Sequence, residues 1–316
     1  MKKISIITPC FNEEDNIERC YQEVKKMMKN QLPKYSYEHI FSDNASTDST
    51  FKVLSSIAKR DKNVKVILNS RNVGPFRNMW NAMKNASGDA VIPLLPADLQ
   101  DPVDVVPKFV KNWEKGDFVV YGVRANREES LIMRAARGLY YRIIRRFADA
   151  VIPINSGEFL LADIKVIKSV LEVDDEYPYI RGLIAQTGVK SSSVKYSWVK
   201  RRSGKSKNSF IDLVDQAING FVSTSRVPAR IALLFGFIFS LLGFIGALLT
   251  LIAFIINRSD APVGVPTIIV SIFLFGGLQL LFFGILGEYI LSIHGQVRKS
   301  PRMFELKKIN FGEVKK

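Results

Sequence analysis

Three short polar clusters contain the residue types of this sequence that could do chemistry together. They are Cys-Phe-Asn-Glu-Glu at 10–14, Asp-Asn-Ala-Ser-Thr-Asp at 43–48 and Pro-Ala-Asp-Leu-Gln-Asp at 96–101. Carboxylate and amide oxygens accept hydrogen bonds from a ligand, and hard divalent cations take oxygen ligands of this kind. Each cluster alone also fits turn chemistry or a helix cap, which Thr47, Asp48 and Asp101 would suit.

Each of the three clusters follows a segment that is predicted to be a strand. Apolar runs predict strands at 4–7, 37–42, 64–68, 90–95 and 118–121, and helical spacing predicts helices at 14–29, 48–60 and 74–86. This alternation predicts a mostly parallel sheet with helices on both faces. Ligands of such sheets bind beyond the carboxyl ends of the strands, where all three clusters fall. We therefore expect the clusters to form one site.

The middle of the chain is more basic and less regular. Residues 131–148 predict a basic amphipathic helix, 163–171 predict another helix, and 194–199 predict a strand that leads into a basic loop at 201–209. Segment 210–223 fits either a packing helix of the soluble domain or an interfacial helix along a membrane. Its position before a long apolar run favours the interfacial helix.

Two C-terminal runs, Ile231–Ile256 and Val265–Ile285, contain no charged residue. About 20 helical residues cross a bilayer, so we expect two membrane-spanning helices. Lysines and arginines flank the outer ends of both runs, which places both ends in the cytoplasm and the loop between them outside. No N-terminal signal peptide is visible, so the large domain is expected to stay cytoplasmic, on the cell inner membrane. Glycines in the runs permit close helix contact, as in a homo-oligomer.

These expectations divide the 316 residues into six parts. They are a cytoplasmic domain at 1–208, an amphipathic interfacial helix at 209–228, a first span at 229–256, an extracytoplasmic loop at 257–264, a second span at 265–293 and a cytoplasmic basic tail at 294–316.

The charge of the chain points to an anionic partner. Lysine and arginine number 45 against 30 aspartates and glutamates, a net charge of +15. Many of the basic residues lie beside the apolar runs, which favours an anionic membrane surface, and no nucleic-acid partner is expected. Cys10 and Cys20 would lie in a reducing compartment, so neither a disulfide nor a metal site is expected from them.

An ordered set of motifs resembles that of the family 2 inverting glycosyltransferases, in the branch of dolichol-phosphate mannose synthases and bactoprenol glucosyltransferases. The motifs lie at 6–14, 43–48, 72–74, 97–102, 121–124, 157–159 and 181–183, followed by the two apolar runs. The set covers nearly the whole chain. The resemblance implies a nucleotide-sugar-binding, Rossmann-like α/β fold of the glycosyltransferase A type, with a mostly parallel sheet.

The resemblance also assigns residues to a nucleotide-sugar donor. The expected donor-binding residues are Pro9, Asn12, Glu13, Asp43, Ala97 and Asp98. Asp43 can accept the imide N–H of uracil, and Glu13 a ribose hydroxyl. Asp98, assisted by Gln100, is the expected ligand of Mg²⁺ or Mn²⁺. Such an ion would offset the charge that develops on the leaving diphosphate.

The expected acceptor is a polyprenyl phosphate. A phosphate monoester has a second pKa of about 6, so it arrives as a ready nucleophile and mainly needs cationic positioning. Guanidinium groups suit this task, and the expected phosphate-binding residues are Arg124, Arg134, Arg202 and Lys205. Glu158 is expected to orient the acceptor or the sugar hydroxyls, which gives a catalytic set of Asp98, Glu158 and Arg124.

The expected activity is inverting transfer of one sugar, from a UDP-linked donor, to undecaprenyl phosphate at the cytoplasmic face. Three positions depart from the family pattern: Pro96 and Asn44 replace aspartates, and Glu158 stands where aspartate is usual. Pro96 keeps open the alternative of a non-catalytic membrane scaffold with a sugar-nucleotide fold. A processive polysaccharide synthase is disfavoured because no Gln-x-x-Arg-Trp motif is present.

Overall fold

The computed structural model describes residues 1–125, 153, 155–173, 175, 178–199, 234–239, 241–243, 245, 264–298 and 303–312. The chain divides into two compact units, one of Met1–Gly220 with Lys299–Lys316 and the other of Phe221–Arg298. The basic helix expected at 131–148, the segment 210–223 and most of the first expected span lie outside the described residues.

The first unit is built on a sheet of eight described strands in the order β7-β5-β6-β4-β1-β2-β3-β8. The elements in chain order are β1 (Lys3–Cys10), α1 (Glu14–Gln31), β2 (Ser36–Asp43), α2 (Thr50–Arg60), β3 (Val64–Asn69), α3 (Pro75–Lys84), β4 (Ala90–Ile92), the 3₁₀ helix η1 (Val103–Val105), α4 (Val106–Glu114), β5 (Val119–Arg124), β6 (Ser156–Asp163), α6 (Ile164–Leu171), α7 (Ile180–Gln186), β7 (Ser191–Tyr196) and β8 (Glu305–Ile309).

The expected mostly parallel sheet is confirmed. The pairs β4–β1, β1–β2, β2–β3 and β5–β7 are parallel, whereas β6 runs antiparallel to β4 and β5, and β8 antiparallel to β3. The parallel strands come from strand–helix alternation, which the apolar spacing predicts. The two antiparallel strands were not among the elements expected from the sequence.

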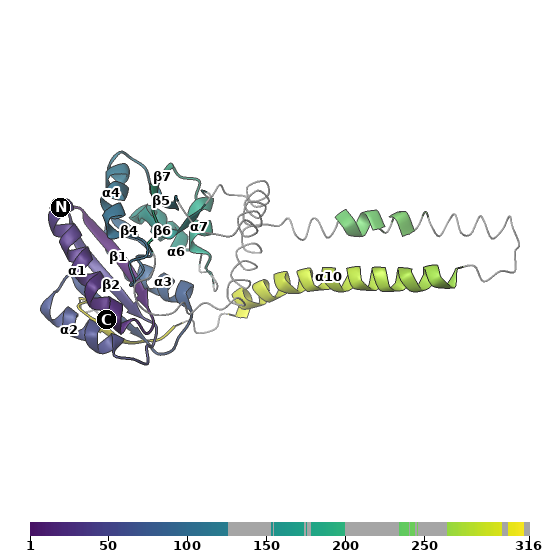
Figure 1. Cartoon of the computed structure of the whole chain (residues 1–316), viewed down its shortest axis with the longest axis horizontal. Helices are drawn as coiled ribbons and strands as arrows, with labels where there is room; N and C mark the ends of the chain where they lie inside the picture. The colour runs from purple at the N-terminus through teal and green to yellow at the C-terminus, as the bar shows by residue number, and fades with distance from the viewer. Residues whose placement is uncertain are drawn as a thin grey trace, which may run out of the picture. The chain divides into compact units, whose positions relative to one another are not determined.

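Helices cover both faces of the sheet, as Figure 1 shows. Alternate residues of each strand point to opposite faces, so Ile4 and Ile6 pack with α1, α2 and α4, whereas Ile7 packs with α3, α6 and α7. Two apolar cores result, one on each side of the strands. The carboxyl ends of the parallel strands are thereby held at a common edge.

The C-terminal segment is anchored to the sheet through β8. Its backbone pairs with β3, and the Ser70 amide donates to the Phe304 carbonyl at 2.9 Å. The Asn310 side-chain amide donates to the carbonyls of Ala58 and Val64 at 2.6 and 2.8 Å. Part of the segment 294–316, expected as a basic tail, is therefore a strand at the edge of the domain.

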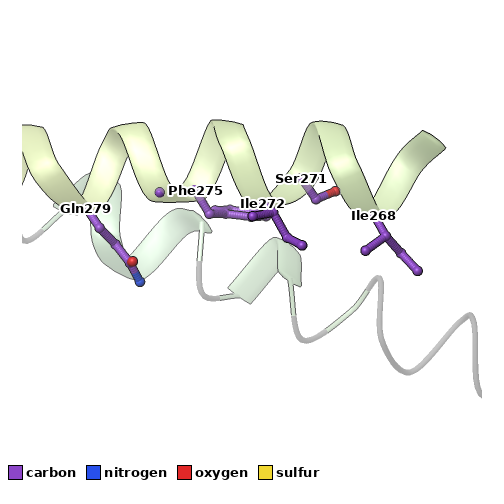
Figure 2. Close-up of a pocket in the computed structure, with 6 residues that line it drawn as sticks. Ile268, Ser271, Ile272, Phe275 and Gln279 are labelled. Carbon is purple, nitrogen blue, oxygen red and sulfur yellow. The ribbon is translucent and has the colours of Figure 1, made fainter. Parts of the chain in front are cut away.

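The second unit contains α10 (Val265–Arg298), a helix of 34 residues. Phe239 packs edge-on against Phe275 with ring centroids 6.3 Å apart. A shallow cavity of about 470 Å³ along α10 is lined by Ile268, Ser271, Ile272, Phe275, Gly276 and Gln279 (Figure 2). Its lining is mostly apolar and contains no ionisable group.

Within the described ranges, no helix satisfies the combined length and apolarity that crossing a bilayer requires. The two expected membrane-spanning helices are therefore not supported by the described part of the chain.

Candidate functional site

A residue with positive φ lies in the loop that follows each of the four parallel strands at the centre of the sheet. Asn12, Ala45, Gly74 and Leu99, which follow β1, β2, β3 and β4, all have positive φ, at 53°, 60°, 85° and 57°. Residues other than glycine adopt this left-handed conformation rarely, and such strain gathers at functional sites. The unusual backbone marks the edge where the sequence predicted a site.

The clusters after β1 and β2 contact each other. The Asn12 backbone amide donates to Ser46 Oγ at 2.9 Å, and Asn12 Oδ1 accepts from the Thr47 amide at 2.7 Å. Glu13 donates its amide to Thr50 Oγ1 at 2.8 Å, and its carboxylate accepts from Asn16 Nδ2 at 2.6 Å. Asn12 and Glu13 therefore help to shape the two loops, in addition to the donor contacts expected of them. Pro9 lies beside Ser42 in the β1–β2 pairing.

Asp43, the last residue of β2, uses its two carboxylate oxygens differently. Oδ1 accepts from the Ser46 amide at 2.9 Å, whereas Oδ2 is buried and has no hydrogen-bond partner among the described residues. Burial raises the pKa of Asp43, against the opposing effect of its hydrogen bonds with Ser46. An unpaired buried acceptor is costly, so this oxygen is suited to receive a ligand N–H.

Asn44, where the family pattern has a second aspartate, organises a network of amides behind Asp43. Its Oδ1 accepts from the Val73 amide at 3.0 Å, and its Nδ2 donates to Asn72 Oδ1 at 2.7 Å. Asn78 Oδ1 accepts from Asn69 Nδ2 at 2.8 Å. This network joins the ends of β2 and β3 to the start of α3 without adding a charge. Sequence reasoning missed it because the partners lie far apart along the chain.

The loop after β4 carries the expected metal ligand. Asp98 Oδ1 accepts from the Gln100 amide at 3.1 Å, which fixes the orientation of the carboxylate. Asp98 and Gln100 are half-buried, whereas Ala97 and Leu99 are buried. Pro96 supplies no side-chain ligand, and the described residues contain no group of three acidic, cysteine or histidine side chains that could cage a metal. One carboxylate fits Mg²⁺ or Mn²⁺ that takes its other ligands from substrate phosphates and water.

Asp101 is buried and paired with Arg124 from β5. Arg124 Nε donates to Oδ1 at 3.2 Å, and Nη2 donates to Oδ2 at 3.1 Å. The Tyr196 hydroxyl, from the end of β7, donates to Oδ1 at 2.6 Å. Asp101 is therefore neither a helix cap nor an available metal ligand. Arg124, expected to bind the acceptor phosphate, has two of its nitrogens engaged within the domain.

Glu158 from β6 and Arg181 from α7 lie beside each other. Glu158 Oε1 is 3.9 Å from Arg181 Nε, and both side chains are mostly buried. Arg181 also donates to the Ser156 carbonyl and to the Tyr179 hydroxyl. The sequence motif around 181 gave no role for this arginine, and the structure places it beside the acidic residue of β6. The other expected phosphate-binding residues, Arg134, Arg202 and Lys205, lie outside the described residues.

Most of the candidate site lies in the part of the chain that matches a known protein family. The family described as "Glycosyl transferase family 2" matches residues 5–171, more than half of the chain. That range contains Asp43, Asp98, Asp101, Arg124 and Glu158.

Relatives with known names match over nearly the full length. A prophage bactoprenol glucosyl transferase homolog of Escherichia coli (strain K12) is 30% identical over 302 residues, which are 95% of this chain and 97% of that protein. An SfII prophage-derived bactoprenol glucosyl transferase of Shigella flexneri is 30% identical over 303 residues, 95% and 96% of the two chains. The putative glycosyltransferase CsbB of Bacillus subtilis (strain 168) is 31% identical over 298 residues, 94% and 89% of the two chains.

Proposed function

The chain belongs to glycosyl transferase family 2, and from this membership we propose that it moves one sugar from a UDP-linked donor to a polyprenyl phosphate. The relatives named bactoprenol glucosyl transferases support a lipid acceptor of this kind. The structural observation that carries the donor part is the buried Asp43 Oδ2 without a partner among the described residues. A uracil imide N–H would satisfy it.

The proposed chemistry needs a divalent ion at Asp98. Mg²⁺ or Mn²⁺ there would offset the charge that develops on the departing nucleoside diphosphate. The Gln100 backbone amide holds the Asp98 carboxylate in place, and the Gln100 side-chain oxygen would be a second ligand of the ion. A single carboxylate is sufficient because the donor phosphates supply further ligands. Pro96, which kept the non-catalytic scaffold open, leaves this carboxylate in place.

The acceptor side of the proposal combines cations with one carboxylate. Arg134, Arg202 and Lys205 would bind the lipid phosphate, and Arg124 would add its positive charge from the end of β5. Glu158, held beside Arg181, would orient the sugar or acceptor oxygens. The phosphate nucleophile is already ionised near neutral pH, so no strong base is required.

We further propose that the enzyme acts at the cytoplasmic face of the cell inner membrane. Support comes from the uncharged runs Ile231–Ile256 and Val265–Ile285 and from apolar side chains exposed on α10, such as Leu280 and Phe283. A membrane-attached enzyme would meet its lipid acceptor by searching in two dimensions. The sugar–lipid product would then serve as a donor for cell-surface glycans.

The test is a transfer assay with the full-length protein, undecaprenyl phosphate, Mg²⁺ or Mn²⁺, and a panel of labelled UDP- and GDP-sugars. We expect one sugar to enter the lipid phase, and EDTA to stop the transfer. Asp98→Ala should lower the rate by at least about 100-fold, because several kcal/mol of charge stabilisation is lost. Asp104→Ala is the matched control, since Asp104 is exposed on η1. Folded wild-type protein that transfers no sugar from any donor would favour the scaffold.

A further inference from the structure

The post-β4 loop, 96–101, holds a strained conformation beside the expected metal ligand. Leu99, between Asp98 and Gln100, has a φ of 57° although it is a buried leucine. A left-handed conformation of a residue other than glycine costs about 1–3 kcal/mol and persists only where the surroundings enforce it. Inside the loop, the Leu99 amide donates to the Pro96 carbonyl at 3.0 Å, and the Gln100 backbone amide donates to Asp98 Oδ1 at 3.1 Å. Something outside the loop must hold its far end.

That far end is held by a group that we call the clasp, formed by Asp101, Arg124 and Tyr196. Asp101 is 1% exposed and accepts three hydrogen bonds, two from the guanidinium and one from the phenol hydroxyl. Arg124 Nε also donates to the Tyr196 hydroxyl at 3.2 Å. Bidentate guanidinium–carboxylate pairs fix geometry as well as charge. The loop is thus attached to the ends of two strands that lie far from it in sequence.

The chain beyond β7 adds a fourth attachment. The Val199 amide donates to the Gln100 carbonyl at 3.0 Å, and the Trp198 ring lies 5.6 Å from the Arg124 guanidinium, within cation–π range. The Tyr196 ring packs edge-on against the Phe159 ring, with 5.5 Å between the ring centroids. Gly122 leaves the space for it, because a Cβ there would approach the ring to 2.9 Å. Backbone and side-chain contacts therefore converge on residues 100 and 101.

We propose that the clasp is a positioning device for the metal site, in which Tyr196 and Arg124 act on Asp98 and Gln100 through Asp101. None of the three clasp residues needs to touch the metal ion. They keep the loop in the strained turn that orients the Asp98 carboxylate and the side-chain amide oxygen of Gln100 toward a donor-bound cation. Because Asp101 is engaged by Arg124 and Tyr196, Asp98 is the only carboxylate of the loop left for the ion, and binding of the ion depends strongly on where that carboxylate points. This inference rests on the proposed function of the same site.

Tyr196→Phe tests the clasp with the least disturbance, since the ring and its packing remain and only the hydroxyl is removed. Tyr21→Phe is a matched control: Tyr21 is also buried and donates to a buried aspartate, Asp61, at 3.0 Å, next to Lys25. That second cluster lies at the start of β3, away from the carboxyl ends of the strands. Both changes remove one tyrosine–aspartate hydrogen bond and should lower Tm by similar amounts.

Two measurements on the full-length protein test whether the clasp positions the metal site. Hydrogen–deuterium exchange should become faster at residues 96–101 in Tyr196→Phe and stay unchanged there in Tyr21→Phe. Mn²⁺ affinity in the presence of UDP, followed by electron paramagnetic resonance, should weaken about five-fold in Tyr196→Phe, the equivalent of one net hydrogen bond. Arg124→Lys, which keeps the charge but loses the bidentate pair, should weaken it further. In transfer assays the apparent KM for Mn²⁺ should rise more than kcat falls.

Unchanged exchange at 96–101 in Tyr196→Phe would overturn the clasp, whatever the protein transfers. Faster exchange with unchanged Mn²⁺ affinity would also overturn it, because the loop would then be held for stability alone. Equal loss of Mn²⁺ affinity in Tyr21→Phe would overturn it as a general effect of destabilisation. Wild-type protein that binds neither Mn²⁺ nor UDP would refute the proposed donor site and the positioning role together. Slow amide exchange in the strands of that same wild-type sample would show that the protein is folded, and so would separate this result from misfolding.

Discussion

Replacing Asp43 by asparagine should weaken nucleotide binding and leave the fold intact or more stable. Asp43 Oδ2 is buried and has no hydrogen-bond partner among the described residues, while Oδ1 accepts from the Ser46 amide. If the asparagine oxygen keeps the Ser46 bond, its N–H₂ group replaces the acceptor at Oδ2. A uracil imide N–H would then face a donor instead of an acceptor. An unpaired buried group costs about 1–3 kcal/mol, which is a loss of about five- to 150-fold in UDP affinity.

Stability should change in the opposite direction. Burial raises the pKa of Asp43 from its ordinary value of 3.8, so folding disfavours the ionised form. A carboxyl with a raised folded pKa stabilises the protein only at low pH, and this contribution is lost as pH rises through the folded pKa. At neutral pH the Asp43 charge therefore opposes folding, and the neutral asparagine should hold or raise Tm. The advantage of Asp43→Asn should shrink as pH falls toward 4.

Calorimetric titration with UDP and thermal unfolding between pH 4 and 8 measure the two effects. Asp61→Asn is the comparison: Asp61 accepts hydrogen bonds from Tyr21 and Asn63, so its replacement should lower Tm without changing UDP affinity. Undiminished UDP affinity in Asp43→Asn would refute the assignment of Oδ2 to the nucleobase. A large fall in Tm of the ligand-free variant would refute the reasoning on burial.

Three further outcomes are expected. Pro96→Asp adds to Asp98 a second carboxylate that is available to a metal ion, and it keeps the carbonyl that accepts from the Leu99 amide. Mn²⁺ should therefore bind more tightly in the presence of UDP, and weaker binding by electron paramagnetic resonance would contradict a metal at this loop. Burial lowers the pKa of His39 to about 3, so the free energy of unfolding should fall as pH drops from about 6.5 toward 3, by up to about 1.4 kcal/mol per pH unit. His39→Gln should therefore flatten the dependence of Tm on pH. An unchanged slope of Tm against pH would rule out His39 as the source of that dependence. Asn310→Gly is compatible with the left-handed backbone, φ 63°, but removes the side-chain hydrogen bonds to the Ala58 and Val64 carbonyls. The free energy of unfolding should therefore fall by about 1–3 kcal/mol. A value equal to that of the wild type in denaturant unfolding would show that β8 is held by its backbone pairing alone.

The resemblance that the ordered motifs indicated is confirmed by the family match over residues 5–171. The mostly parallel sheet also followed from the sequence, because helices and parallel strands leave local periodic patterns of apolar residues. Strand ends carry turn chemistry that is equally local. For this reason the order of residues along the chain is enough to locate the clusters around Asp43 and Asp98.

Contacts between distant segments had no such local signal. The antiparallel strand β6 lies between β4 and β5, and β8 pairs with β3 at the edge of the sheet, so both strands pair with segments that are far from them in sequence. Asp101 resembled a helix cap in sequence, and only the tertiary structure places it against Arg124 and Tyr196. A buried carboxylate needs partners, and the sequence could not say that its partner would be a tyrosine 95 residues away. The sequence by itself thus determined the family, the central strands and the position of the candidate site, because these depend on neighbouring residues. Which acidic side chains are paired within the domain, as Asp101 is, and which keep an unpaired buried oxygen among the described residues, as Asp43 does, was decided by the tertiary structure, because it depends on which side chains meet at the sheet edge.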